Sequence, residues 1–292
     1  SIFMLASMSK PIVSSAILRL IDEGKLGLDD ELATYLPQFS SMLVAPNGSF
    51  DQPFEEAKRP ITIRHLLTHT SGFTYPPAVL GVGDVAEQYS EVNLLFAPSA
   101  EEFLDILSQL PLVAHPGEAF HYSVSIDVLG AIIEKLTNKR LGDYLREVIF
   151  EPLGMDNTAF YVPQEKRKLM PRIYGPATPN NPAPFFENDP IKWQIAEVLY
   201  FGLTYEQIGP RGPIDSGGGG LYSSSSDFGK YTQMVANGGT YGETRIMSAR
   251  AASLHFQNLM PNLGLDAFRA NFGDAATYMQ FGGGFGIKRE ED

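Results

Sequence analysis

The sequence predicts an α+β protein whose middle part is mainly helical. Hydrophobic residues recur at helical spacing in several segments of the 292-residue chain. Strands and helices do not alternate in the manner of a doubly wound parallel sheet. The chain also contains 28 glycines and 21 prolines outside any short repeat, which indicates many turns between packed elements and not a fibre.

The chain is expected to begin with a helix over residues 7–24. The apolar residues of this segment share one face, and Pro11 lies in the first turn, where a missing N–H costs little. Gly24 stands where a C-terminal cap is expected. A short helix stopped by Pro37 follows, and the pattern predicts another helix over 62–67.

The later elements are predicted from the same signals. Ser99 can cap a helix that runs to Leu110, because its hydroxyl can accept a bond from a free N–H of the first turn. The remaining expectations are an irregular segment at 73–98, helices at 126–136, 141–150 and 227–235, a Pro-rich stretch at 163–215 and a strand at 278–287. A Pro-rich stretch of this length inside a compact protein often covers a site.

Composition excludes several classes of function. The chain has 34 acidic and 22 basic residues, and such an acidic surface repels nucleic-acid phosphates, so no nucleic-acid partner is expected. The absence of cysteine excludes disulfides, iron–sulfur clusters, thiolate zinc sites and a cysteine nucleophile, and it fits a reducing compartment such as the cytoplasm. No run of about 18 apolar residues is present, so no membrane-spanning helix is predicted.

Ser7 and Lys10 form the first candidate for chemistry. They lie three residues apart at the start of the predicted helix, so their side chains share a face. The helix N-terminus favours a developing oxyanion at Ser7. Apolar neighbours disfavour the charged form of Lys10, and its neutral amine can then take the proton of the Ser7 hydroxyl. The simpler interpretation is a capping serine and a solvated lysine, because S-x-x-K is a short motif.

Tyr122 is the candidate for the third group that such a pair needs. It stands in the segment HYSVS, just before the helix predicted at 126–136. A phenol near a lysine ammonium can act first as a base and then as an acid. The alternative is a half-buried tyrosine that packs where a loop meets a helix.

Several segments resemble, in order, the serine β-lactamase and penicillin-binding-protein superfamily. Within it the sequence is most similar to the β-lactamase-like carboxylesterases, the family VIII esterases. The segments are FMLASMSKP (3–11), ILRLIDEGKLGLDDELATYLPQF (17–39), ITIRHLLTHTSGF (61–73), HPGEAFHYSVSIDVLG (115–130), EPLGMDNTAF (151–160) and DSGGGGLYSSSSDFGKYTQM (215–234).

The resemblance implies a β-lactamase/transpeptidase-like α+β fold, in which an antiparallel sheet flanked by helices adjoins an all-helical part, with the active site between them. The α/β part would be 1–30 with 211–292, and the mainly helical part 31–210, with the Pro-rich loop at 163–210. The family's first strands and last strands would then lie outside this chain.

The resemblance also implies the roles of the site residues. Ser7 would be the acylated nucleophile, Lys10 its general base, and Tyr122 the group that carries the proton to and from the leaving alcohol. The backbone N–H of Ser7 would supply half of the oxyanion hole. No metal and no organic cofactor would be needed.

Two departures from the family pattern bear on the substrate. The second motif usually reads Tyr-x-Asn, and here Val124 takes the place of the amide that binds a peptide-like substrate. Val124 is the one substrate-binding position carried over, and its inability to hydrogen-bond favours plain esters. The third motif, Lys-Thr-Gly or Trp-Gly-Gly in relatives, is not found; 281–287 is the nearest candidate, and it is interpreted as the Gly-rich strand before that motif.

Other candidates are weaker. His65 and His69 have zinc-like i, i+4 spacing without the Glu of H-E-x-x-H, and His69 is interpreted as a structural hydrogen-bonding residue. The run 217–220 lacks the Lys-Ser/Thr of a phosphate loop and is expected to pack close to other backbone. No G-x-S-x-G elbow occurs. Asp105 and Asp127, like Glu118, are assigned solvated or capping roles.

The sequence therefore predicts a hydrolase of carboxylic esters, particularly short-chain ones, with a small-molecule ester as its partner. The alternatives are a β-lactamase or D-alanyl carboxypeptidase, an acyltransferase, and a catalytically inactive binding homologue. Neither the natural ester nor the oligomeric state follows from the sequence.

Overall fold

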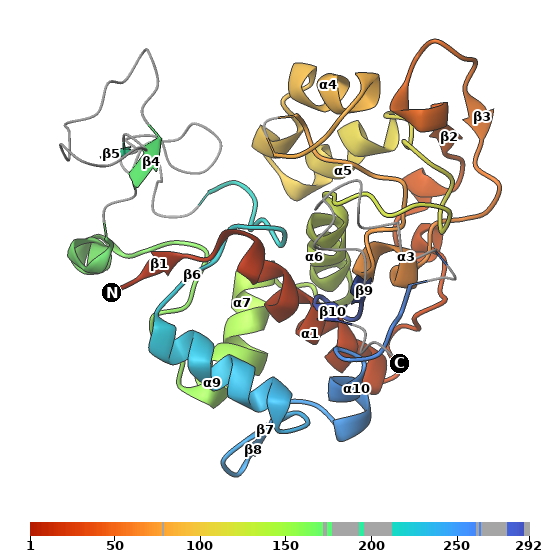
Figure 1. Ribbon diagram of the computed structural model, residues 1–292. Coiled ribbons are helices and arrows are strands. Elements are labelled where there is room, and N and C mark those ends of the chain that lie inside the picture. The colour runs from red at the N-terminus through yellow and green to blue at the C-terminus, as the bar shows by residue number, and fades with distance from the viewer. Residues whose placement is uncertain are drawn as a thin grey trace.

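A computed structural model describes residues 1–77, 79–171, 174–176, 193–195, 212–260, 263 and 279–288. Helix α1 (Ser9–Asp22) runs through the centre of the molecule, and a 3-10 turn at Ala6–Met8 leads into it (Figure 1). Helix α1 packs against α6 (Ser125–Thr137) and α10 (Ala249–Ser253). Because α1 is buried along nearly its whole length, the residues at its first turn are held in a rigid setting.

Most of the other helices lie where the sequence predicts them, and α4 and α10 are additional. Thr62 caps α3, Ser99 caps α5 and Ser224 caps α9, each by accepting a bond from the backbone N–H three residues on. The helices other than α1, α6 and α10 are α2 (Leu32–Tyr35), α3 (Ile63–Leu67), α4 (Asp84–Glu91), α5 (Ala100–Ser108), α7 (Leu141–Leu145), α8 (Glu151–Leu153) and α9 (Ser225–Ala236). No helix in the described part of the chain is both long and apolar enough to cross a membrane.

Within the described residues the strands form short antiparallel pairs. The pair that matters for the site joins β1 (Phe3–Met4) to β6 (Tyr222–Ser223), with Met4 opposite Tyr222. The other pairs are β2 (Leu43–Val44) with β3 (Glu55–Glu56), β4 (Tyr174–Pro176) with β5 (Trp193–Ile195), β7 (Thr240–Tyr241) with β8 (Thr244–Arg245), and β9 (Met279–Phe281) with β10 (Gly286–Lys288).

Two expectations about secondary structure were wrong. The segment 73–98 is not wholly irregular, because it contains α4, which buries Val85 and Tyr89 on one face. The segment 278–287 is not one strand, because Gly284 at φ +90° lies in a tight turn that makes it the β9–β10 hairpin. Most of the Pro-rich stretch 163–215 lies outside the described residues, so its covering role stays a prediction.

A buried chain of hydrogen bonds anchors the β9–β10 hairpin to the core. The Ser15 hydroxyl lies 2.9 Å from both the Tyr231 hydroxyl and His255 Nε2, and His255 Nδ1 bonds to the carbonyl oxygen of Gly283. Since a carbonyl only accepts, Nδ1 carries the proton and the Ser15 hydroxyl donates to Nε2. The Ser15, Tyr231 and His255 side chains are all fully buried, so this chain ties α1 and α9 to the hairpin.

Acidification is expected to weaken the fold through His255. Burial lowers the pKa of His255 to about 4, against about 6.5 in an unfolded chain. The folded state therefore binds fewer protons between these values, so its stability is complete above pH 6.5 and falls as the pH drops towards 4. The expected loss is about 3 kcal/mol. Urea unfolding at pH 7, 5.5 and 4 measures it, and His255→Gln should show a smaller decline; an equal decline would contradict the assignment.

Candidate active site

Ser7 lies on the surface at the entrance to α1. It belongs to the 3-10 turn Ala6–Met8 and is exposed to solvent. Ala6 immediately before it has φ +46°, a left-handed backbone conformation that costs a residue with a Cβ about 1–3 kcal/mol. The strained turn presents the Ser7 hydroxyl at the helix N-terminus, which is the position that the sequence predicts.

Lys10 lies beneath Ser7 and is 3% exposed. Its Nζ is 3.4 Å from the Ser7 Oγ and donates a hydrogen bond of 2.6 Å to the carbonyl oxygen of Gly218. The same Nζ lies 4.5 Å from the ring centre of Tyr122 and 5.3 Å from that of Tyr75. Both distances are within the range at which an ammonium is attracted to an aromatic face.

The surroundings of Lys10 differ from the expectation. The sequence places apolar side chains around the Ser7–Lys10 pair, whereas the contacts of Nζ are a backbone carbonyl and two tyrosine rings. Gly218 is 208 residues from Lys10, so no local pattern could reveal this contact. The fold thus holds the lysine amine in one place between the Ser7 hydroxyl and the Gly218 carbonyl.

Tyr122 is brought to the pair as predicted. Its half-buried ring stands in the loop before α6, over Lys10 and 4.7 Å from the imidazole of His69 between ring centres. Ser7, Lys10 and Tyr122 therefore converge although 112 residues separate Lys10 from Tyr122 in the chain. The fold thus brings a hydroxyl, an amine and a phenol together at one place.

His69 contacts the second motif, the segment that carries Tyr122 and Ser123. It is fully buried, and its Nδ1 lies 3.2 Å from both the backbone nitrogen and the hydroxyl of Ser123. Burial and the nearby charge of Lys10 hold the pKa of His69 well below its usual value, so the ring is neutral. Since Nδ1 accepts from the Ser123 N–H, Nε2 carries the proton. The structural role expected for His69 is confirmed.

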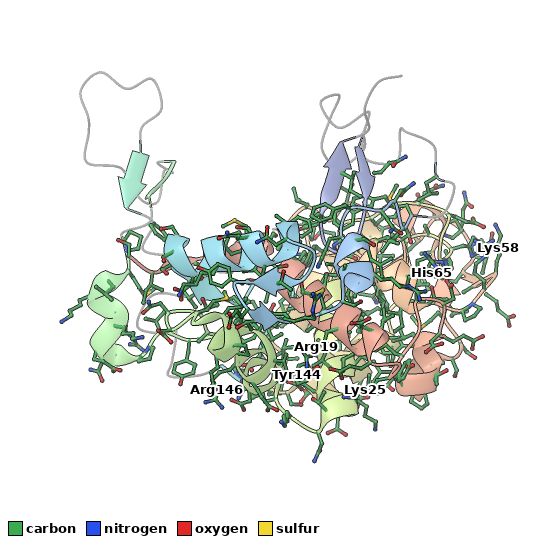
Figure 2. The ribbon with its side chains drawn as sticks, turned by 90° about the horizontal axis from the view of Figure 1, so that it is seen from below. Arg19, Lys25, Lys58, His65, Tyr144 and Arg146 are labelled. Atoms are coloured by element: carbon green, nitrogen blue, oxygen red, sulfur yellow. The ribbon has the colours of Figure 1, made fainter. Side chains whose placement is uncertain are left out.

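His65 does not pair with His69. Its Nδ1 accepts from the N–H of Thr62 and completes the cap of α3, and burial lowers the pKa of His65 to about 4. His65 lies near Lys58 at the edge of the molecule, away from Arg19 and Tyr144 (Figure 2). Among the described residues no group of three or more His, Asp or Glu could hold a metal ion.

Val124 is part of the hydrophobic core. Its side chain is 0% exposed, and its backbone N–H donates to the carbonyl oxygen of Thr74. The sequence predicts that the Val124 side chain contacts the substrate. The side chain has no exposed surface with which to make that contact. The reason is that the residue immediately precedes α6, where its apolar side chain is buried in the core.

Asp127 is a site residue that the sequence analysis missed. Its Oδ1 accepts a bond of 2.6 Å from the Ser216 hydroxyl and one of 3.0 Å from the N–H of Gly218. The solvated or capping role assigned to Asp127 is therefore wrong. Its place in the first turn of α6, five residues after Tyr122, was the available signal. Asp127 thus bonds to the N–H of the same glycine whose carbonyl accepts from Lys10.

The glycine run packs closely, as predicted. A Cβ at Gly218 would lie 2.4 Å from Asp127 Oδ2 and 2.7 Å from the Tyr75 hydroxyl, and one at Gly217 would lie 2.6 Å from the Ile126 carbonyl. A side chain at either position would push the 216–220 segment away from α6. Glycine is thus required for the carbonyl to reach Lys10.

Replacing Asp127 with alanine is expected to lower kcat for an ester substrate about 10- to 100-fold, because Gly218 loses its anchor and Lys10 its fixed partner. Asp127→Asn keeps an oxygen acceptor and should restore kcat to within a few-fold of wild type. Steady-state kinetics with thermal unfolding measures both effects. The exposed Asp105→Asn is the control, and an Asp127→Ala enzyme with unchanged kcat would contradict the positioning role.

Known proteins are similar to this chain over most of its length. A family model described as "Beta-lactamase" matches residues 1–288. Protein Rv1367c of Mycobacterium tuberculosis is 30% identical over 256 residues, which are 87% of this chain and 58% of that protein. Esterase EstB of Burkholderia gladioli is 33% identical over 255 residues, which are 86% of this chain and 61% of EstB. The chain thus spans about 60% of the length of these relatives.

Among solved structures, the chain is similar to EstCE1, described as a hydrolase with promiscuous acyltransferase activity. The TM-score is 0.71 at 26% sequence identity, and the match covers 99% of this chain and 70% of that one. The similarity extends over almost the whole chain, so it includes the segments that carry Ser7, Lys10 and Tyr122.

Proposed function

This chain belongs to the Beta-lactamase family, and we propose that it is a serine hydrolase that cleaves carboxylic esters through an acyl-enzyme on Ser7. The predicted family and α+β fold are confirmed. The observation that carries the proposal is the position of Lys10 Nζ, 3.4 Å from the Ser7 Oγ and beneath the ring of Tyr122. A hydroxyl, an amine and a phenol in this arrangement can perform acyl transfer without a metal.

In the proposed mechanism the Lys10 amine accepts the proton of Ser7 as its Oγ attacks the ester carbonyl carbon and forms the new C–O bond. An N–H of the Lys10 amine stays on the Gly218 carbonyl, which keeps the nitrogen beside the Ser7 hydroxyl. The N–H of Ser7 contributes to the binding of the oxyanion. The bond to the alcohol oxygen breaks as Tyr122 gives that oxygen its phenol proton, and Tyr122 regains a proton from the Lys10 ammonium. The same pair then takes a proton from the water that hydrolyses the acyl-enzyme and returns one to the Ser7 Oγ.

Short-chain esters are the proposed substrate class. Val124 stands where β-lactamases and transpeptidases have an amide side chain, and its buried apolar side chain leaves no hydrogen-bonding group at this position for a peptide-like substrate. The relative EstB carries the name esterase, which supports esters as the substrate class. Acyl transfer to an alcohol is a second candidate, since the similar protein EstCE1 is a hydrolase with promiscuous acyltransferase activity.

The test uses the full-length protein with p-nitrophenyl butyrate, a chromogenic cephalosporin and a fluorophosphonate probe. We expect turnover of the ester to exceed that of the cephalosporin, and mass spectrometry to locate the probe on Ser7. Faster cephalosporin turnover would replace the proposal with a β-lactamase or carboxypeptidase. Faster transfer to an added alcohol than to water would indicate an acyltransferase, and no labelling would indicate an inactive homologue.

A further inference from the structure

A cavity of about 260 Å³ lies next to the 216–220 segment. One wall is the face of α6 that carries Ala131, and the opposite wall comes from α5 and the turn before it, with Phe96 and Phe103. Phe160 and Ile214 contribute further apolar surface. Figure 1 shows α5 and α6 side by side, with the segment that follows residue 212 passing near them.

The cavity is continuous with the elements that carry the site. Met4 and Tyr222, which pair between β1 and β6, line it, and so do Gly219 and Gly220. Met4 precedes Ser7 by three residues, and Gly219 follows the glycine whose carbonyl accepts from Lys10. The two segments that form the Ser7–Lys10 site therefore also form a wall of the cavity.

The polar groups around the cavity are bonded within the protein. Asp215 is 5% exposed, forms an ion pair of 2.8 Å with Arg140 and accepts from the N–H of Gly142. Glu134 accepts from the N–H of Leu141, and Asp127 accepts from the Ser216 hydroxyl and the Gly218 N–H. The surface left for a ligand is mainly hydrocarbon, and the acidic groups disfavour an anion.

We propose that this cavity binds an uncharged apolar chain of the ester substrate. The inference rests on the proposed function. The volume lies just below the range of about 300–1,000 Å³ typical of drug-sized ligands, which suits a chain of a few carbons. Burial of that chain would fix the ester carbonyl near Ser7 and make the enzyme prefer butyrate or hexanoate esters over acetate esters.

Filling the cavity tests the proposal. Ala131 is 9% exposed on α6, and Ala131→Phe would place an aromatic ring in the space proposed for the chain. We expect the ratio of kcat/KM for p-nitrophenyl hexanoate to that for p-nitrophenyl acetate to fall about 10- to 100-fold. Ala100→Phe narrows the cavity from α5 and should lower the same ratio. With two variants, the test stands even if one of them folds poorly. Ala236→Phe, at an exposed position on α9, is the control.

Two substrate series identify which part of the ester enters the cavity. A change confined to esters of varied acyl length assigns the cavity to the acyl chain, and a change confined to acetates of varied alcohol assigns it to the alcohol. Unchanged ratios in both series, for a folded and active Ala131→Phe or Ala100→Phe, would overturn the cavity assignment alone. A wild-type protein without ester turnover or labelling at Ser7 would overturn the proposed function as well.

Discussion

Replacing Ser7 with alanine is expected to abolish ester hydrolysis, with a fall in kcat on the order of 10⁴- to 10⁶-fold. The variant lacks the oxygen that becomes acylated, and the remaining groups can only orient water. The fold should be unaffected, because Ser7 is exposed and the 3.4 Å contact with Lys10 is the one hydrogen bond that its hydroxyl makes within the described residues. Hydrolysis of p-nitrophenyl butyrate and thermal unfolding are the two measurements.

Ser226→Ala is a matched control for this experiment. Ser226 is exposed in the first turn of α9, so the same change of side chain is made at another helix start. It should leave both turnover and melting temperature unchanged. Turnover retained by Ser7→Ala at more than about 1% of wild type would exclude the Ser7 acyl-enzyme.

The second large effect is expected at Lys10. Lys10→Met keeps much of the buried volume but removes the amine that lies between the Ser7 Oγ and the Gly218 carbonyl. Without a nearby base the Ser7 hydroxyl is a weak nucleophile, so kcat/KM should fall at least about 10³-fold. The rate of fluorophosphonate labelling should fall with it, since labelling also requires an activated Ser7.

Lys25→Met is the control for the loss of a lysine. Lys25 is half-exposed and pairs with Glu23 on the side of the molecule away from Lys58 and His65 (Figure 2). Such a surface ion pair contributes about 0–1 kcal/mol, and its loss should not change turnover. A Lys10→Met enzyme that keeps wild-type kcat/KM while Ser7→Ala is inactive would show that another group, such as Tyr122, acts as the base alone.

The element predictions that succeeded rest on local signals. Ser99 caps a helix as predicted, and the helix predicted over 62–67 begins after its cap Thr62, because a cap depends on bonds within one turn. The prediction for 73–98 failed because the burial of Val85 and Tyr89, and not local propensity, stabilises α4. The division of the chain into 1–30 with 211–292 and 31–210 stays a prediction.

The sequence by itself determined the features on which the proposed chemistry rests: the Ser7–Lys10 spacing at a helix start and the motif at Tyr122. The Ser7–Lys10 pair could be recognised because a separation of three residues places both side chains on one face of a helix. Tyr122 could be recognised because it lies in a family motif. Only the tertiary structure decided that the Gly218 carbonyl reaches Lys10, that Asp127 accepts a bond from the N–H of the same glycine, and that a cavity adjoins the site. Such contacts join segments up to about 200 residues apart and form only when the whole core packs, so no local pattern encodes them.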